Sequence, residues 1–501
     1  MIVDGLTLTK DRTEEADVVI IGSGAGGAVL AAELAERGRT VVVLEAGQAH
    51  PPGEITGGPA EMTVRLYRFN GIVATLGRPG IALPYGQCLG GTTVINSGTC
   101  FRLPDTVLAR WQREVGLDGI TRELLAPIFD QLEDFLGVAP VDEKVMGRNA
   151  ELFKKGAQAL GYKHGVLRRN ARACKGTGMC AFGCPTKAKQ SMDVSFVPRA
   201  ERAGARFYTS VRALDLIVEG GAARGVVGRL TDPTGEHLRP EKVTVRAKAV
   251  ALAGGAIGTP YLLLRNKLCR RGPVGKHLSI HPAAKVFAEF DEEVRGWLGI
   301  PQSYHCDEFH DQGIIFENIF VGPEFTAMAL PYFGRRHAEI MTKYPRLAAF
   351  GMMVSDTSRG FVLKGLGEYG VPYYFLNQAD TLKFRKGLAE ACRIFLAAGA
   401  TRVYPNLPHC PELTTTAEID QLERAPLKGT HIELMAFHPM GTCRMGTDPR
   451  TSVVDANLET HEVKRLYVTD ASIFPTSLGV NPQMGIMAFA TRAAAHIHET
   501  I

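Results

Sequence analysis

The sequence predicts an α/β protein built around a Rossmann-like dinucleotide-binding domain. An apolar strand over residues 17–21 leads into a glycine-rich turn, GSGAGG at residues 22–27, and helix-forming residues 28–37 follow. A second apolar strand over residues 40–44 ends at Glu45. This order of elements is typical of a dinucleotide-binding unit. The chain has 501 residues, 45% hydrophobic and 22% charged, so it is long enough for a second core.

The glycines of this turn have separate tasks in the prediction. Gly22 permits the tight turn, and Gly24 lets a pyrophosphate approach the backbone at the helix N-terminus. Gly27 lets helix and strand pack closely, and Glu45 stands where a carboxylate can accept both ribose hydroxyls. A glycine-rich turn in another α/β unit is the alternative. The fingerprint alone does not separate NAD from FAD.

A second glycine-rich loop lies in residues 84–105, PYGQCLGGTTVINSGTCFRLPD, and includes Gly90, Gly91, Thr92 and Asn96. One small dinucleotide does not need a second loop of this kind. A cofactor with a long ribityl chain and a bulky tricyclic ring does. Considered by itself, the Gly-Gly-Thr-Thr pattern fits a simple turn equally well.

The C-terminal segment decides between these possibilities. It holds His438, an apolar strand over residues 466–470, an Asn481-Pro482 loop and helix-forming residues 482–496. With these, the chain closely resembles the glucose–methanol–choline (GMC) oxidoreductase family. The matching passages, in the family's order, are GSGAGG with Glu45, GQCLGGTTVINSG, LAGGAIGTPYLLL, VGKHLSIHP, HPMGTCRMG, VTDASIFP and NP.

The resemblance implies a discontinuous FAD-binding domain of Rossmann-like type, formed by residues 1–105, 190–285 and 432–501. It also implies a second, α+β substrate-binding domain over residues 286–431, built on an antiparallel sheet. Residues 106–189 form a helical insert that ends in a cysteine-rich stretch. The sequence predicts helices over 105–115, 122–136, 336–344 and 380–398. It predicts strands over 348–355 and 360–363, flanking a turn.

The resemblance also implies a catalytic pair over the flavin. His438 is expected to take the hydroxyl proton of an alcohol, because a neutral imidazole suits this task near neutral pH. Asn481 is expected to hold the substrate oxygen through its amide. Two other classes stay open, a non-redox lyase that retains FAD and a non-catalytic subunit that only binds flavin. His281 also matches the family and is expected to be structural.

The residues expected to contact FAD come from all three parts of the FAD-binding domain. They are Gly22, Gly24, Ala25, Gly27, Glu45, Gly90, Gly91, Thr92, Asn96, Val211, Asp470, Ala471 and Pro482. Gly441 and Thr442 are expected near the isoalloxazine ring.

Cys174, Cys180 and Cys184 form the pattern C-x5-C-x3-C-P, with glycines between them. Closely spaced thiolates on an irregular backbone are typical of iron–sulfur sites, and three ligands suit a three-iron cluster. The stretch is similar to that of FAD-dependent sugar dehydrogenases of the same family, which carry a [3Fe-4S] cluster. Structural thiols, a disulfide and a zinc site remain alternatives. The neighbouring Lys187 and Lys189 are expected to be solvated.

The cluster would pass electrons singly to an acceptor protein such as a cytochrome; without it, the enzyme would be an alcohol oxidase that uses dioxygen. The substrate is expected to be a small-molecule alcohol. Methionines and aromatic residues in 286–431 favour a hydrophobic or aromatic one, although a methionine stripe is also typical of a protein core. A net charge of +5 from 57 basic and 52 acidic residues argues against a nucleic-acid partner. We see no membrane-spanning run and no export signal. The ten cysteines are too dilute for a disulfide scaffold. A cytoplasmic location is therefore expected, or a periplasmic one if a partner carries the signal.

Overall fold

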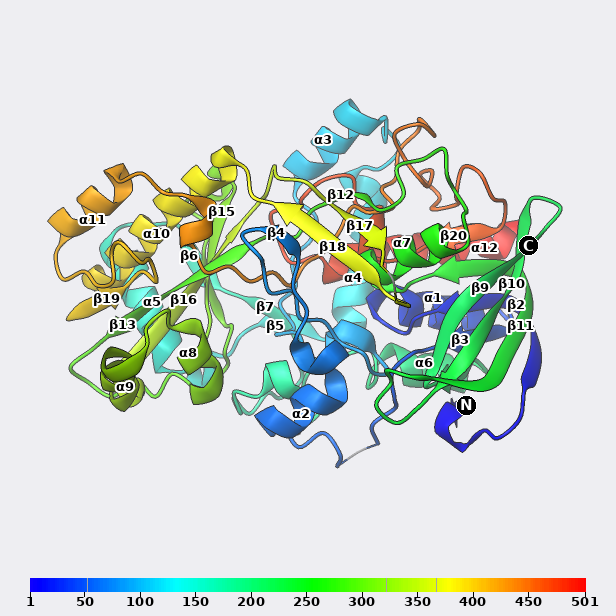
Figure 1. Ribbon diagram of the computed structural model, residues 1–501, viewed down its shortest axis with the longest axis horizontal. Helices are drawn as coiled ribbons and strands as arrows, with labels where there is room; N and C mark the ends of the chain where they lie inside the picture. The colour runs from blue at the N-terminus through cyan, green and yellow to red at the C-terminus, as the bar shows by residue number, and fades with distance from the viewer. Residues whose placement is uncertain (52, 321, 366) are drawn as a thin grey trace.

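The computed structural model describes every residue from 1 to 501 except 52, 321 and 366. Two large sheets lie toward opposite ends of its longest axis, with a four-stranded sheet between them (Figure 1). No helix in the described part of the chain is long and apolar enough to cross a membrane.

The first sheet has eight strands and is mostly parallel. Seven of them lie side by side in the order β1 (Ile2–Asp4), β8 (Arg206–Thr209), β3 (Val41–Leu44), β2 (Arg12–Ile21), β11 (Leu238–Leu252), β10 (Ala222–Thr231) and β9 (Val211–Glu219). The eighth, β20 (Leu466–Val468), pairs in parallel with β11. Only β10 pairs antiparallel with its neighbours, β9 and β11. Strands from the beginning, middle and end of the chain therefore share one sheet.

Helices cover this sheet and share its hydrophobic core. α1 (Ala25–Glu36) packs against α6 (Phe196–Arg202) and α12 (Gln483–Thr500), and α12 also contacts α4 (Arg122–Leu136). Residues 18–20 of β2 are fully buried, as expected for a parallel strand that is covered on both faces. The other helices on this side are α2 (Pro59–Leu66), α3 (Asp105–Val115) and α7 (Gly255–Arg265).

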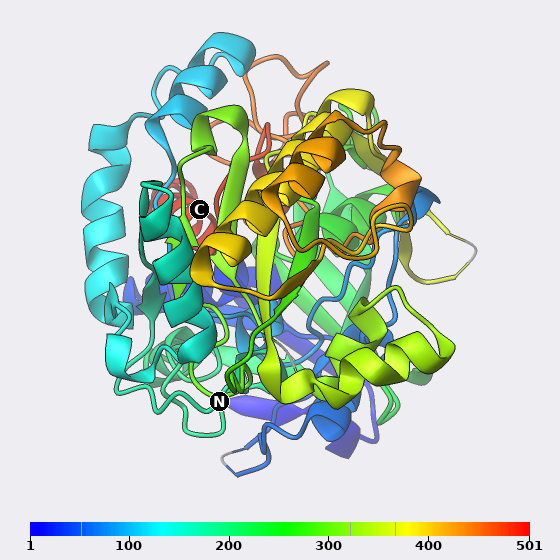
Figure 2. The same ribbon diagram turned by 90° about the vertical axis from the view of Figure 1, so that its left-hand side faces the viewer.

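The second large sheet has six strands, and every pair in it is antiparallel. Their order is β19 (Arg402–Tyr404), β13 (Ala283–Glu289), β16 (Leu347–Val354), β15 (Ile314–Asn318), β14 (Tyr304–Cys306) and β6 (His164–Val166). Helices α5 (Arg148–Ala159) and α10 (Gln378–Ala398) pack on it, and Figure 2 views this end of the molecule. The remaining helices here are α8 (Pro323–Ala329), α9 (Gly334–Thr342) and α11 (Thr416–Arg424).

Two small sheets complete the fold of the described residues. The four-stranded one has the order β12 (Lys276–Leu278), β17 (Gly360–Lys364), β18 (Gly370–Phe375) and β4 (Leu76–Arg78). The other pairs β5 (Val138–Pro140) with β7 (Arg168–Asn170). β7 leads into the cysteine-rich stretch and ends four residues before Cys174.

The observed elements follow the predicted ones to within a few residues at their ends, apart from two larger differences. β2 begins at Arg12 rather than at residue 17, because residues 12–16 extend the pairing with β11 and the buried Glu14 forms ion pairs with Arg12 and Arg206. The strands predicted to flank a turn lie in different sheets, as β16 and β17. The segment between them does not fold back, because backbone amides at positions 357 and 358 donate to the carboxylate of Asp380.

Candidate active site

The two glycine-rich loops meet at the carboxyl ends of β2 and β3. Glu45 accepts hydrogen bonds from the backbone N–H and the hydroxyl of Ser23, at 2.9 and 2.7 Å, and from Gly47 N–H at 2.8 Å. The Ser23 hydroxyl in turn accepts the N–H of Gly90 at 3.0 Å. Burial raises the pKa of Glu45. One serine therefore fixes the acid at the end of β3 against the second loop.

Close backbone contacts explain several of the glycines. A Cβ at Gly27 would lie 1.9 Å from the carbonyl oxygen of Gly22, and one at Gly26 would lie 1.6 Å from that of Thr469. A Cβ at Gly24 would meet no described atom within 4 Å, so the approach to the N-terminus of α1 is open. Gly91 lies over Gly24, since its Cβ would stand 3.0 Å from the Gly24 Cα. Together these glycines form a closely packed backbone turn, which we call the glycine cradle, and its surface is open at Gly24.

Val211 and Asp470 lie at the two sides of this cradle. The N–H of Val211 donates to the Glu45 carbonyl at 2.9 Å. Asp470 accepts the N–H of Gly255 at 2.9 Å and the hydroxyl of Thr259 at 2.5 Å, so it lies at the N-terminus of α7. Burial raises the pKa of Asp470. The carbonyl of Ala471, next in the chain, accepts the N–H of Gly441.

The second glycine-rich loop is tied to α12, directly after Asn481 and Pro482. The amide of Asn96 donates to Gln483 Oε1 at 3.0 Å, and Gln483 Nε2 donates to the Thr99 carbonyl at 2.7 Å. Asn481 is 9% exposed, and its Oδ1 has no hydrogen-bond partner among the described residues. The Oδ1 atom of Asn481, the predicted partner of His438, is thus buried and able to accept a further hydrogen bond.

His438 contacts His281, which in turn holds the loop that leads to Asn481. The Nδ1 atoms of the two rings are 3.4 Å apart, and the rings meet edge to face at 85°. His281 Nε2 accepts the backbone N–H groups of Leu478 and Gly479, both at 3.0 Å. Burial lowers the pKa of each histidine to about 3, so both are neutral near pH 7.

These hydrogen bonds assign the ring protons. His281 Nε2 accepts two N–H groups, so the neutral ring carries its hydrogen on Nδ1 and donates toward His438. His438 therefore carries its own hydrogen on Nε2. The sequence predicted only a structural role for His281. No motif showed that it touches His438, because the contact joins positions 157 residues apart.

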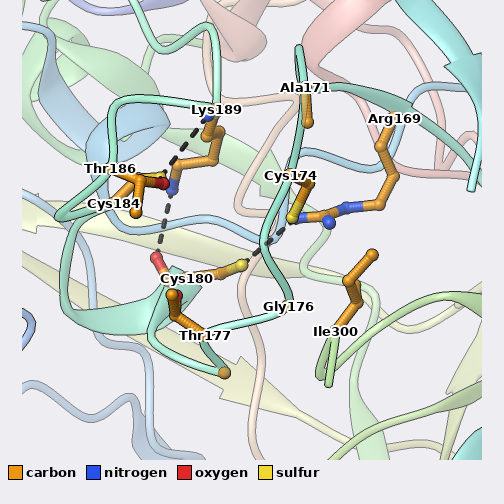
Figure 3. A pocket seen from close by; sticks show the side chains of 11 residues that line it. Arg169, Ala171, Cys174, Gly176, Thr177, Cys180, Cys184, Thr186, Lys189 and Ile300 are labelled. Atoms are coloured by element: carbon orange, nitrogen blue, oxygen red, sulfur yellow. Dashed lines mark hydrogen bonds between the residues drawn. The ribbon is translucent and has the colours of Figure 1, made fainter. Parts of the chain in front are cut away.

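Cys174, Cys180 and Cys184 line one small cavity together with Arg169 and Lys189 (Figure 3). Arg169 Nη2 donates to Cys180 Sγ at 3.2 Å, and the backbone N–H of Lys189 donates to Cys184 Sγ at 3.5 Å. Burial acts to raise the pKa of Cys184, but the hydrogen bonds to its sulfur outweigh it, and the pKa is lowered. Across the described residues, however, no three His, Cys, Asp or Glu side chains stand in an arrangement that could hold a metal ion. The three cysteines face one space without forming a ready coordination site.

The prediction that Lys189 is solvated is wrong, although its neighbour Lys187 is exposed. Lys189 is 1% exposed, and its ammonium group donates to the carbonyls of Val94, Asn96 and Cys180 at 2.7, 2.5 and 3.1 Å. Burial lowers its pKa to about 8. Three backbone carbonyls therefore bind this cation. The residues next to Lys189 in the sequence gave no signal that would predict these contacts.

Arg169 makes a parallel connection, because its Nε donates to the carbonyl of Ser97 at 2.6 Å. We call residues 90–97 the Gly90 loop. Two cations, Lys189 and Arg169, therefore bind its carbonyls from one side and line the cysteine cavity from the other. The cysteine-rich stretch is the support on which the second glycine-rich loop rests.

Comparison with known proteins agrees with this arrangement. Residues 63–283 and 357–490 match models of the GMC oxidoreductase family, and residues 20–61 match the NAD(P)-binding Rossmann-like domain. An uncharacterized GMC-type oxidoreductase of Mycobacterium tuberculosis is 38% identical over 492 residues, which cover 98% of this chain and 77% of that protein. A long-chain-alcohol oxidase of Arabidopsis thaliana is 29% identical over 527 residues, covering 98% and 68%.

The fold is also found among solved structures. Pyridoxine 4-oxidase from Mesorbium loti superposes with a TM-score of 0.73 at 19% identity, covering 97% of this chain and 99% of its own. This likeness confirms the predicted fold class, a Rossmann-like domain joined to an α+β part.

Proposed function

Because the chain belongs to the GMC oxidoreductase family, we propose that it uses FAD to oxidise the CH–OH group of an alcohol to an aldehyde or ketone. The family itself makes the protein an oxidoreductase. The observation that carries the finer proposal is the contact of His438 with the histidine that holds the Asn481 loop.

The chain's residues fit FAD. The face of Gly24 is open, and Glu45 stands at the end of β3 with both oxygens in a fixed orientation. The hydroxyl of Thr469, next to Asp470, is buried without a partner among the described residues. An open donor beside a glycine cradle suits the ribityl and phosphate oxygens of the cofactor. Bound FAD supplies the acceptor for the two electrons and the α-hydrogen of the alcohol.

His438 receives the hydroxyl proton in this proposal. Its neutral state near pH 7 leaves one ring nitrogen able to accept a proton. That nitrogen is Nδ1, which faces His281. The ring must therefore turn about its Cβ–Cγ bond to meet the hydroxyl. At 3.4 Å the contact that it gives up is weak.

Asn481 orients the alcohol. Its amide N–H donates to the alcohol oxygen and stabilises that oxygen as the hydroxyl proton passes to His438. The loop that bears Asn481 keeps its position through His281, so both members of the pair depend on one buried ring.

An apolar alcohol is the substrate class that we propose. Ile315 and Met353 are buried opposite each other in the six-stranded sheet, on the face away from α10. The alcohol oxidase from Arabidopsis acts, by its name, on long-chain alcohols. Neighbouring methionines of β16 serve different faces of the sheet, since Met352 packs into the core under α10 while Met353 faces the other way.

An anaerobic alcohol screen tests the proposal. The FAD-loaded protein is mixed with primary and secondary alcohols of increasing length, and the loss of flavin absorbance near 450 nm is followed. We expect apolar alcohols to bleach the flavin. Bleaching by none of them, together with cleavage of a hydroxynitrile, would instead identify a lyase that retains FAD.

We further propose that the cysteine cavity takes up a [3Fe-4S] cluster, which would hand electrons singly to a protein such as a cytochrome. Three sulfurs face one cavity, and hydrogen bonds from N–H groups to sulfur are typical of iron–sulfur sites. Arg169 and Lys189 place positive charge beside an anionic cluster. The loop must close around the metal, which its glycines with positive φ, Gly176, Gly178 and Gly183, allow.

Iron and acid-labile sulfide are to be measured per chain after anaerobic purification, with electron paramagnetic resonance of the oxidised protein. We expect about three irons per chain in the wild type and loss of iron in Cys180→Ala. Cys306→Ala, a buried cysteine of the six-stranded sheet, is the matched control and should retain its iron. Absence of iron from the wild type would leave dioxygen as the acceptor and give the three cysteines a structural role.

A further inference from the structure

A row of polar residues crosses the six-stranded sheet on one face. The register pairs Lys285 with Gly351, Gly351 with Glu317, and Glu317 with His305. Residues directly opposite each other in neighbouring strands point to the same face. His305, Glu317 and Lys285 therefore share one face, with only a glycine between the last two.

This face is turned toward the nucleotide-binding part of the molecule. The opposite face carries Val286, Phe316 and Phe350, which belong to the core under α5 and α10. On the polar face, the ring of His305 contacts Phe101, which follows the Gly90 loop in the chain, at a centroid distance of 5.8 Å. Lys285 Nζ donates to Met435 Sδ at 3.2 Å, three residues before His438.

A chain of hydrogen bonds joins Glu317 to the catalytic segment. Gln302 Nε2 donates to Glu317 Oε2, and the Thr99 hydroxyl donates to Gln302 Oε1 at 3.2 Å. The Thr99 carbonyl accepts Gln483 Nε2 at 2.7 Å, two residues after Asn481. Glu317 thus belongs to the same polar network as the loop proposed to hold the alcohol oxygen.

Glu317 has one oxygen to spare. It is 7% exposed, and its Oε1 has no hydrogen-bond partner in the described part of the chain. Burial raises its pKa to about 7, so it is present both as acid and as carboxylate at neutral pH. An unpaired buried polar group costs free energy, which a ligand that supplies the missing donor would recover. No described side chain supplies it.

We propose that Glu317 determines substrate specificity by accepting a hydrogen bond from a second polar group, a hydroxyl or an amine, of an otherwise apolar alcohol. This inference rests on the proposed oxidation of alcohols. Ile315 and Met353 lie two residues along their strands from this polar row, about 7 Å away. The geometry points to an alcohol whose apolar body lies along these two residues, with its second polar group at Glu317.

Matched alcohol pairs test the inference. Flavin reduction is measured in the stopped flow with 1-octanol against 1,8-octanediol, and with benzyl alcohol against 4-aminobenzyl alcohol. We expect the wild type to prefer the member with the second polar group. Glu317→Leu should lower that preference in kcat/KM by about 10- to 100-fold, mainly through KM, because the hydrogen bond to a charged group is lost. The kcat/KM for the plain alcohol, which offers no second polar group to Glu317, should fall by less than that for its partner.

Two further variants separate recognition from folding. Glu317→Gln keeps the shape and an acceptor oxygen, so it should fold and keep part of the preference for the diol. Glu289→Gln changes another glutamate of the same sheet, which is already bonded to Lys343 and Tyr404, and should keep the full preference. An unchanged preference in both Glu317 variants, or an equal loss for both members of each pair, would overturn the inference.

A binding role of Glu317 can be tested even if the protein does not oxidise alcohols. If no alcohol bleaches the flavin, phenol and toluene are titrated instead, with the flavin spectrum as readout. They have nearly the same shape, but only phenol carries an O–H donor. Tighter binding of phenol by the wild type, lost in Glu317→Leu, would retain Glu317 as a binding residue even without alcohol oxidation. Equal binding of both probes would exclude that role.

Discussion

Replacing His438 by alanine is expected to lower the rate of alcohol-driven flavin reduction by about 10²- to 10⁴-fold, the range that a positioned general base contributes. The loss should appear in kcat as well as in kcat/KM, because the proton is transferred only on the way to the transition state. Single-turnover mixing of the FAD-loaded variant with an alcohol identified by the screen measures it directly.

The pKa of His438 adds a second expectation. Burial keeps this pKa near 3, below that of a free histidine, so the neutral form persists as the pH is lowered from 8 to 5. Protonation of His438 should therefore not reduce the wild-type rate across this window. His237→Ala removes an exposed histidine and serves as the control, with an unchanged rate. A His438→Ala variant that reduces its flavin at the wild-type rate would exclude His438 as the base.

Replacing Lys189 by methionine is expected to destabilise the protein by about 3 kcal/mol or more. The substitution removes three hydrogen bonds from a buried cation and leaves the carbonyls of Val94, Asn96 and Cys180 without their donor. For a chain of this size, with an unfolding entropy of about 1 kcal/mol/K, we expect the unfolding temperature to fall by roughly 3 °C or more. Differential scanning calorimetry of the FAD-free proteins gives this value.

The same variant should also affect FAD. Two of the carbonyls that Lys189 binds belong to the Gly90 loop, so loss of the cation should loosen the loop and lower the FAD content of the purified protein. Lys187→Met removes a lysine two positions away that is exposed, and it is expected to match the wild type in both measurements. Lys189→Met with unaltered melting and full FAD content would show that the loop does not depend on this cation.

The sequence was sufficient to predict those elements whose conformation depends on residues close together in the chain. The glycine turn of residues 22–27 and the flanking strands were predictable, because backbone crowding around Gly22 and Gly27 leaves only glycine as a solution. The helices α3 and α4 were predictable from their amphipathic pattern, and both end at a glycine in the left-handed conformation, Gly116 and Gly137.

Signals that depend on distant contacts were not readable in the same way. Lys189 has the composition of a surface lysine, and only the path of the Gly90 loop places three carbonyls around it. Glu317 lies in an apolar strand without any motif, and its importance appears only when the register aligns it with His305 and Lys285. The sequence shows which residue stands at each position. The strand register determines on which face of the sheet its side chain lies.

β20 pairs with β11, and α12 packs against α1. These contacts limit how much of the nucleotide-binding part can fold while the ribosome is still synthesising the chain. The glycine turn of residues 22–27 is made first, but the strand and helix that close its surroundings lie beyond residue 465. Synthesis proceeds from the N-terminus, so the face of α1 that packs against α12 lacks this contact during most of translation. Closure of the surroundings of the glycine turn is therefore a late event, which waits until the residues of β20 and α12 have been made.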